Sequence, residues 1–242
     1  MGGLLCAGRM NLSKAKGRYT KMKIKALVAV RSGSQRVQNK NIRPFADSNL
    51  LEIKLLQLKR IKNLDGVIVN SNDDYMLEVA RTLGCETVKR EQYYASNEVS
   101  MSEVYKNMAE NFNGDIIVYT NVTNPLLKDE TIEKAIDTYL MRSEDFDSLN
   151  SAHLIKEFMF ENGKPINYDL SRQPRSQDLP NIYALNFAIN IIERSKMIEC
   201  KNVVGAHPLI WGIDEVEATD IDNPIDFEFA EYIYKANKRK NK

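Results

Sequence analysis

From Lys25 onward, short runs of β-branched and apolar residues alternate with stretches whose apolar residues recur at helical spacing. Such alternation is typical of βαβ units, which place their strands in a mostly parallel sheet and their helices on its faces. We therefore expect an α/β protein with a Rossmann-like, mostly parallel sheet flanked by helices. The predicted strands are 26–30, 67–70, 86–88 and 116–120, followed later in the chain by 185–192 and 203–206.

The predicted helices fill the intervals between these strands. Residues 50–61 carry apolar side chains at positions 50, 51, 53, 55, 56, 58 and 61, which is a helical rather than an alternating pattern. Acidic residues open the helices predicted from Asp73 and from Asp129, and Gly84 ends the first of these. Two further helices are expected, at 100–112 and at 224–236.

The chain has 242 residues, enough for one good core, and we expect a single main domain from residue 22 to residue 242. Residues 1–21 carry basic but no acidic side chains and show no periodicity. This favours a disordered basic extension or an upstream start codon over a functional arm. Residues 142–184 lose the alternation, so we expect a protruding insertion that could mediate dimerisation.

Composition excludes several classes of protein. The net charge of +1 gives no global attraction to nucleic acid. No apolar run approaches the roughly 20 residues that span a bilayer. The three cysteines include no C-x-x-C pair, which favours free thiols in a reducing compartment over a disulfide framework or a zinc site. We expect a cytoplasmic protein with no nucleic-acid or membrane partner.

The first predicted strand runs directly into a basic, glycine-containing loop. Loops at the carboxyl end of the first parallel strand are where α/β proteins bind ligands, and three cations in this loop suit a triphosphate. The spacing matches neither the dinucleotide fingerprint nor a Walker A loop. A solvated basic turn is the alternative interpretation. The loop residues expected to bind a nucleotide are Arg31, Gly33, Ser34, Arg36, Lys40 and Asn41.

Near the end of the chain, Asp220 and Asp222 alternate along an extended segment, which sends both carboxylates to one face. Two convergent carboxylates suit Mg²⁺, a cation that prefers oxygen ligands and is often coordinated by carboxylates and phosphates together. The alternative is a polar turn in which Asp222 or Asn223 caps the last helix, with Pro224 in its first position. Both roles can hold at once, since one residue can bind metal while its neighbour caps.

The basic loop resembles the A-R-x-G-S-x-R-x-x-x-K-N signature of the acylneuraminate cytidylyltransferases, the CMP-sialic acid synthetase family. Val30 is an extra residue between the Ala and the Arg of that signature. Similar blocks occur in family order from about Lys25 to Glu231, which is most of the chain. The matched letters of the loop are Ala29, Arg31, Gly33, Ser34, Arg36, Lys40 and Asn41.

The other blocks imply roles for residues outside the loop. By resemblance, Arg90 and Ser100 contact cytosine, although Asn97 stands where the family usually has Asp. The Asn121-Val-Thr-Asn-Pro125 block is similar to the family's Q-x-T-S-P, and Thr219-Asp-Ile-Asp222 to its metal-binding D-I-D. Acceptor-binding residues implied in this way are Asn121, Arg175, Gln177 and Asn186.

The main departure follows Pro180. Family members often continue with an Arg and N-G-A-x-Y, and of that pattern only Asn186 and Ala188 remain here. The missing Arg and Tyr belong to the acceptor side of the family's pocket. The resemblance therefore supports the use of CTP better than it supports sialic acid as the acceptor.

Taken together, the resemblance implies an Mg²⁺-dependent enzyme that transfers CMP from CTP to an acidic 2-keto-3-deoxy sugar and releases pyrophosphate. It implies Arg31, Lys40 and Asp222 as catalytic residues, and a homodimer in which residues 153–184 could act in the partner's site. Two alternatives stay open: a cytidylyltransferase for another sugar or polyol, and a catalytically silent nucleotide-binding homologue.

Overall fold

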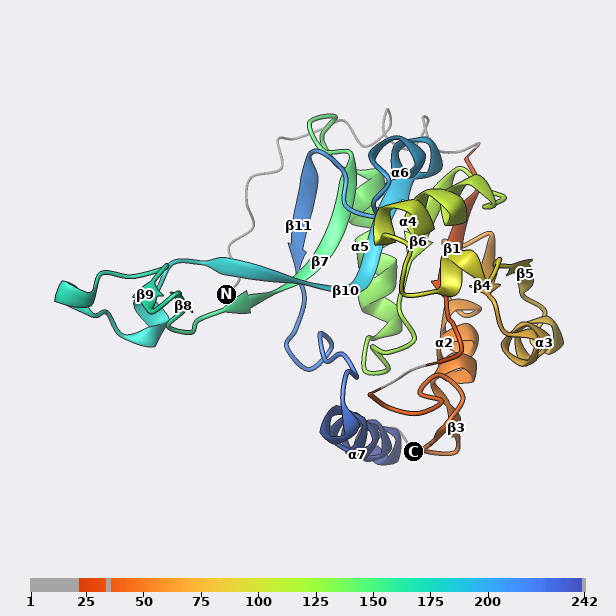
Figure 1. Ribbon diagram of the computed structural model, residues 1–242, viewed down its shortest axis with the longest axis horizontal. Helices are drawn as coiled ribbons and strands as arrows, with labels where there is room; N and C mark the ends of the chain where they lie inside the picture. Colours follow the sequence, from red (N-terminus) through yellow and green to blue (C-terminus); the bar gives the residue numbers. More distant parts are fainter. Residues whose placement is uncertain (1–21, 34–35, 241–242) are drawn as a thin grey trace.

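The computed structural model describes residues 22–33 and 36–240. A seven-stranded sheet forms its centre, with the strand order β11-β7-β10-β6-β1-β4-β5 (Figure 1). The extension predicted at residues 1–21 lies outside the described residues. The strands are β1 (Ile24–Ala29), β4 (Gly66–Ser71), β5 (Glu86–Lys89), β6 (Ile116–Tyr119), β7 (Ser148–Ile155), β10 (Ile182–Glu193) and β11 (Pro208–Gly212).

The sheet is mixed, with parallel pairing on one side of β6. Strand β1 pairs in parallel with β4 and with β6, and β4 pairs in parallel with β5. Strand β10 runs antiparallel to both β6 and β7, while β11 is parallel to β7. The prediction of a mostly parallel α/β sheet is confirmed. The chain leaves β1 toward β4 and later returns to β6 on the other side, which creates a switch point at the carboxyl end of β1.

Helices cover both faces of the sheet, because successive strand residues point to opposite sides. Val28 belongs to the buried cluster that contains residues of α2, α3, α5 and α7, whereas its neighbour Leu27 belongs to the cluster on the other face, with residues of α4 and α6. The helices are α2 (Leu50–Leu58), α3 (Asp74–Thr82), α4 (Met101–Glu110), α5 (Asp129–Leu140), α6 (Arg194–Cys200) and α7 (Pro224–Lys240). The result is a three-layer α/β/α arrangement in which every predicted helix is present.

Three elements differ from the sequence prediction. The strand expected at 203–206 is wrong, because β11 occupies 208–212 instead, and helix α6 before it was not predicted. The insertion predicted over 142–184 is shorter, because 148–155 form β7 inside the main sheet. What projects is the segment 156–181, called the arm below.

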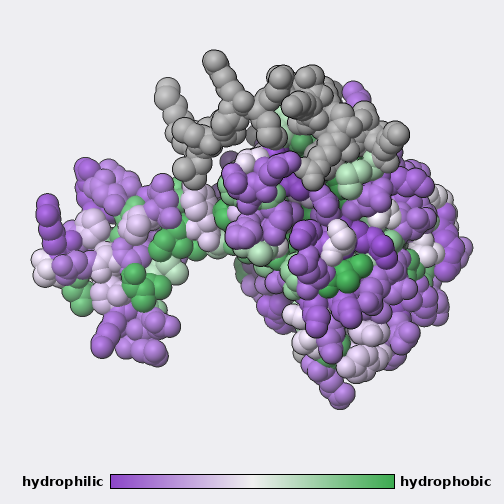
Figure 2. Space-filling view, turned by 90° about the horizontal axis from the view of Figure 1, so that it is seen from above, coloured by the Kyte–Doolittle hydropathy of each residue, from purple (hydrophilic) through white to green (hydrophobic). Residues whose placement is uncertain are grey.

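The arm extends to one side of the sheet from the ends of β7 and β10 (Figure 1). It contains the two-stranded ribbon of β8 (Phe160–Glu161) and β9 (Lys164–Pro165) and short 3-10 turns. Several of its apolar side chains are more than half exposed: Phe160 at 54%, Ile166 at 55% and Leu170 at 62%. Figure 2 shows hydrophobic residues gathered on this arm.

None of the described helices is both long and apolar enough to cross a membrane. Of the cysteines in the described ranges, Cys85 is buried, Cys200 is exposed, and both are free thiols.

Candidate active site

The basic loop predicted from the sequence follows β1 directly and lies at the switch point of the sheet. Gly33 adopts a φ of +85°, a left-handed conformation that favours glycine, and a Cβ there would meet no atom within 4 Å. The loop returns to its own start through Asn41, whose side-chain Nδ2 donates to the Arg31 carbonyl at 3.2 Å. Ser34 falls in the gap between the described residues, so its assignment stays a prediction.

Arg31 reaches from this loop toward the segment after β5. Its Nη1 donates to the carbonyl of Ala95 at 2.7 Å, and both terminal nitrogens lie 3.0 Å from Asn97 Oδ1. The amide at 97 takes the place of the Asp in the family pattern. Because an amide carries no charge, it orients the Arg31 guanidinium without neutralising it.

Arg36 and Lys40 reach in the other direction, toward the segment before α7. Arg36 Nη2 lies 2.8 Å from Asp222 Oδ1 in an exposed ion pair, and Lys40 Nζ lies 3.9 Å from the same oxygen. Lys40 also donates to the Ile221 carbonyl at 2.6 Å. Burial lowers the pKa of Lys40, and the charges of Asp220 and Asp222 act in the opposite direction. The loop therefore spans the distance between the Asn97 segment and the acidic segment.

Asp220 is the more buried of the two predicted metal ligands. Its Oδ1 is buried and has no hydrogen-bond partner among the described atoms. Burial raises the pKa of this carboxyl, and a hydrogen bond from Thr123 counteracts the rise. A buried acceptor without a donor is costly unless a ligand satisfies it. Within the described ranges, no group of three or more His, Cys, Asp or Glu side chains forms a metal cluster.

The start of α7 shows which residue of the acidic segment caps the helix, the alternative to metal binding considered for Asp222. Asn223 Oδ1 accepts from the backbone N–H groups of Ile225 and Asp226, and Asp226 Oδ2 accepts from Asn223 N at 2.8 Å. This reciprocal pattern is a capping box, with Pro224 in the first helical position as expected. Asn223 is the cap, so the Asp222 carboxylate is not needed for that purpose.

Arg90, a predicted cytosine contact, is buried beside the end of β4. Its Nε donates to Asn70 Oδ1 at 2.6 Å and its Nη2 to the Asn70 carbonyl at 2.9 Å. Burial lowers the pKa of Arg90 to about 10, so the guanidinium stays charged at neutral pH. Ser100, the other predicted contact, caps α4 by accepting from Glu103 N at 3.3 Å. Asn70 holds the Arg90 side chain in place, and Ser100 has a structural role of its own.

The acceptor residues predicted near the sheet, Asn121 and Asn186, lie on neighbouring elements at the carboxyl end of β6. Asn121 follows β6, and Asn186 lies in a bulge of β10 where the pairing with β7 shifts between Leu185 and Asn190. Asn186 Oδ1 accepts from Ser151 Oγ at 2.6 Å, whereas its Nδ2 is buried without a partner. This amide therefore has a donor to offer at the same edge of the sheet as the basic loop.

The bulge places Phe187 in the left-handed region, with a φ of 54°, at the position where the family pattern has glycine. Such a conformation costs about 1 kcal/mol or more for a side chain with a Cβ. We therefore expect Phe187→Gly to be about 1 kcal/mol more stable than Phe187→Ala, as measured by chemical denaturation. Both variants lose the packing of the same ring, so their difference isolates the backbone.

Leu185 provides the control for this comparison, because it belongs to the same strand without a positive φ. There the usual order should hold, with Leu185→Ala more stable than Leu185→Gly. If the order at Phe187 matches the order at Leu185, residue 187 is not held in the left-handed region.

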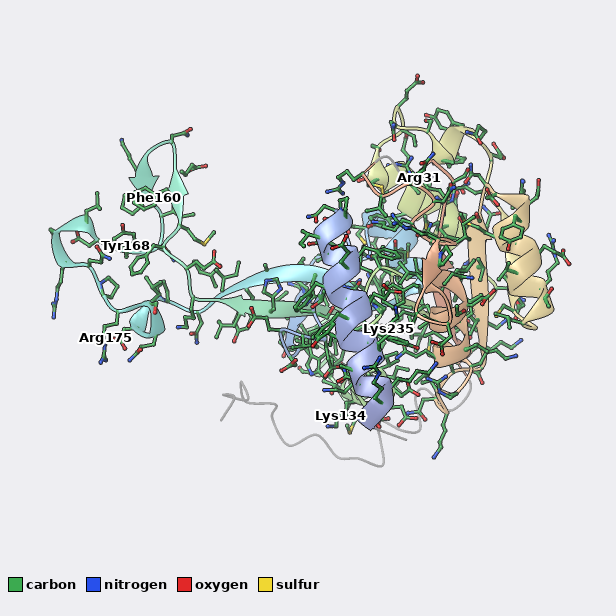
Figure 3. All side chains as sticks on the ribbon, turned by 90° about the horizontal axis from the view of Figure 1, so that it is seen from below. Arg31, Lys134, Phe160, Tyr168, Arg175 and Lys235 are labelled. Carbon is green, nitrogen blue, oxygen red and sulfur yellow. The ribbon has the colours of Figure 1, made fainter. Side chains whose placement is uncertain are left out.

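Arg175 and Gln177 are not brought to this site within one chain. Both are exposed on the arm, and Figure 3 shows Arg175 at the opposite end of the molecule from Arg31. Arg175 Nε pairs with Asp178 Oδ2 at 2.7 Å, an exposed ion pair of small energetic value. The described chain thus unites the predicted phosphate, base and metal residues but leaves these two acceptor residues apart.

Sequence reasoning missed Asn72, which follows β4 at the same edge. Its Oδ1 accepts from Ser32 N at 3.3 Å, and its Nδ2 donates to Ser32 Oγ and to Gln92 Oε1, both at 3.1 Å. Asn72 therefore joins the basic loop to the segment that carries Arg90 and Asn97. A search for polar residues just after each parallel strand would have found it.

A basic loop at the switch point of an α/β sheet, facing a pair of carboxylates, is an arrangement typical of proteins that bind a nucleotide polyphosphate. The family model described as cytidylyltransferase matches residues 25–233. The chain belongs to this cytidylyltransferase family and is therefore a nucleotidyltransferase.

Individual relatives are distant but cover nearly the whole chain. The post-translational flagellin modification protein B of Campylobacter coli is 25% identical over 86% of this chain and 93% of its own. A pseudaminic acid cytidylyltransferase of Campylobacter jejuni is 24% identical over 89% of this chain and 98% of its own. The fold resembles a CMP:2-keto-3-deoxy-manno-octonic acid synthetase solved with CTP, at a TM-score of 0.66 and 11% identity over 89% and 99% of the two chains.

Proposed function

We propose that this enzyme transfers CMP from CTP to an acidic 2-keto-3-deoxy sugar of the nonulosonate type and releases pyrophosphate. The observation that carries this proposal is the approach of Arg36 and Lys40 to Asp222 at the switch point, 2.8 and 3.9 Å from its Oδ1. The acceptor class rests on relatives named for pseudaminic, legionaminic and acylneuraminic acids.

The side chains fit a reaction that asks for positioning and charge neutralisation rather than covalent catalysis. A sugar hydroxyl attacks the α-phosphorus in line, the bond to the β-phosphate oxygen breaks, and pyrophosphate leaves with the extra charge. Arg31 and Lys40 supply cations on either side of the loop to balance that charge. Arg90, fixed by Asn70, supplies donors toward the base.

Asp220 and Asp222 are the residues that would hold Mg²⁺. The unpaired Oδ1 of Asp220 and the exposed carboxylate of Asp222 fit a cation that takes one or two protein carboxylates and completes its shell with phosphates and water. When bound, Mg²⁺ would neutralise charge on the phosphates. We also propose a cytoplasmic location, in keeping with the free thiols of Cys85 and Cys200.

Pyrophosphate release, measured with CTP and a panel of acceptors, tests the function. The panel should contain nine-carbon keto-sugar acids, an eight-carbon 3-deoxy keto acid and a polyol phosphate. Release with a nine-carbon acid alone supports the proposal. Release only with the polyol phosphate favours the alternative acceptor, and release with none favours a silent homologue. Equal binding of ATP and CTP would remove the cytosine assignment from Arg90.

We further propose that the arm serves the acceptor site of a second subunit in a homodimer. The separation of Arg175 from Arg31 within one chain supports this arrangement (Figure 3). So do the exposed Phe160, Ile166 and Leu170 on the arm, since a patch of this kind on a projecting segment is typical of a protein interface.

In this arrangement Arg175→Ala should raise the sugar KM or lower kcat by about 10-fold or more, while the Kd for CTP stays nearly unchanged. The reason is that the guanidinium binds the sugar carboxylate and not the nucleotide. Steady-state kinetics and CTP titration measure the two effects. Arg172→Ala, also exposed on the arm, is the matched control and should keep wild-type kinetics. A large loss of CTP affinity would place Arg175 on the nucleotide instead.

Mixing Arg175→Ala chains with Asp222→Asn chains distinguishes a site shared between subunits from one within a chain. A shared site predicts that mixed dimers recover activity, because one of their two sites carries neither change. If mixing restores nothing although the subunits exchange, the arm does not act across the dimer.

A further inference from the structure

Helix α2 buries a lysine. The side chain of Lys54 is fully buried, with 0% exposure, among residues such as Leu51, Leu55 and Leu58 that face the sheet. Its Nζ donates to Gln57 Oε1 at 2.9 Å and to the backbone carbonyl of Asn124 at 3.1 Å.

A buried amine lowers the stability of a core. Transfer of a charged group out of water is unfavourable, and apolar residues of similar volume are often equal or better in stability. Burial lowers the pKa of Lys54 to about 7, and the charge of Asp129 opposes this effect. Packing alone therefore does not account for a lysine at this position, whereas its hydrogen bonds do.

Those hydrogen bonds lead to the loop that follows β6. Asn124 accepts from Lys54, and Gln57 Nε2 donates to the Leu127 carbonyl at 2.6 Å. Helix α2 thus fixes the loop 121–127 at two backbone carbonyls. Asn121, the predicted acceptor amide, lies three residues before Asn124 in this same loop.

The loop in turn fixes the acidic segment. Asn124 Nδ2 donates to the Thr219 carbonyl at 3.0 Å, directly before Asp220. Ile221 N donates to the Thr123 carbonyl at 2.9 Å, between the two aspartates. These hydrogen bonds therefore connect Lys54, through the 121–127 loop, to the backbone on either side of Asp220 and, through the Ile221 carbonyl, to Lys40.

We propose that Lys54 is a positioning residue, whose buried amine sets the placement of the 121–127 loop and of the 218–222 segment relative to the basic loop. Its effect on turnover rests on the function proposed above. Misplacement of reacting groups by about 1 Å can cost about 100-fold in rate even when the change lies far from the chemistry.

Lys54→Met tests this, because methionine fills similar space without donors. We expect the melting temperature at pH 7 to equal or exceed that of the wild type, kcat to fall about 10- to 100-fold, and the Kd for CTP to change less than about 3-fold. Backbone hydrogen exchange should become faster in residues 121–127 and 218–222 and remain unchanged in β1 and β4. Leu58→Met on the same buried face is the control, and should keep kcat and normal exchange in both segments.

A pH series checks that the amine is buried as described. Between its pKa of about 7 in the folded protein and the ordinary 10.5, the unfolded chain binds more protons than the folded one. Raising the pH through this window therefore stabilises the wild type but not Lys54→Met. The melting-temperature advantage of the variant should shrink from pH 7 to pH 9, and a constant difference would contradict a buried amine.

Wild-type kcat and normal exchange in Lys54→Met would overturn the positioning role. Should this variant fail to fold, Lys54→Gln, which keeps a donor, takes its place and should retain part of kcat. If the wild type itself transfers CMP to no member of the acceptor panel, the proposed function fails, while the exchange measurement still decides the role of Lys54.

Discussion

Replacing Asp222 with Asn is expected to lower kcat by about 10² to 10³, or about 3 to 4 kcal/mol of transition-state stabilisation. The substitution keeps size and removes one charge from the proposed cation site. Folding should barely change, because Asn223 caps α7 and the exposed pair between Arg36 and Asp222 contributes at most about 1 kcal/mol. Single-turnover kinetics and thermal melting separate the two effects.

Asp226→Asn is the matched control for this variant. Asp226 Oδ2 accepts from the backbone N–H groups of Asp222 and Asn223, so its loss should reduce stability more than turnover. Raising the Mg²⁺ concentration should recover part of the activity of Asp222→Asn. If Asp222→Asn melts earlier but keeps its specific activity, the carboxylate is structural and the metal assignment is wrong.

Lys40→Met is expected to lower kcat by about 100-fold and to weaken CTP binding, because it removes the cation that we propose faces the leaving pyrophosphate. Affinity for CMP should stay near the wild-type value, since CMP has no β- or γ-phosphate. Kinetics together with titrations of CTP, CMP and pyrophosphate measure these effects.

Lys62→Met controls for the loss of a positive charge, because Lys62 is an exposed lysine outside the site. It should keep wild-type turnover. Equal losses of CMP and CTP affinity in Lys40→Met would show that Lys40 contacts the α-phosphate or the nucleoside instead.

The parallel half of the sheet could be predicted because its strands are apolar and its helices carry clear end signals. Val67–Val69 and Ile116–Val118 are buried on both faces, so they form the continuous apolar runs typical of parallel strands. Asp73 and Ser100 cap α3 and α4 through their side chains, as polar residues before helical patterns do.

Strand β7 could not be predicted from hydrophobicity, because its buried residues include Ser148, Asn150 and Ser151. Two of these side chains are satisfied within β7 and across to β10: Ser148 Oγ donates to Asn150 Oδ1, and Asn150 Nδ2 donates to Asn190 Oδ1, both at 2.9 Å. At Val203 the error was the opposite one, because a strand was predicted where none forms. Val203 is a buried apolar residue of the cluster that contains α4 and α6, but it does not belong to a strand.

In the site, too, features made of residues close in sequence could be predicted, and features made of residues far apart could not. The basic loop and the pair of aspartates are each formed by neighbouring residues, so their sequence patterns revealed them. Lys54 was missed because a charged residue in a helical pattern is normally assigned to the solvent face. Lys54 lies three residues after Leu51 and four before Leu58, which places it on the buried side of α2. At this position helical spacing is a better guide to burial than the charge of the side chain.

The ion pair between Arg36 and Asp222 has a thermodynamic consequence for ligand binding. In the structure the two side chains are paired with each other, at 2.8 Å. A polyanion that binds Arg36 therefore frees the Asp222 carboxylate, and a cation that binds Asp222 frees the Arg36 guanidinium. Linkage makes this effect reciprocal: each ligand raises the affinity for the other by the same factor. For an exposed pair of this kind the factor is about 5 at most, and added salt should reduce it.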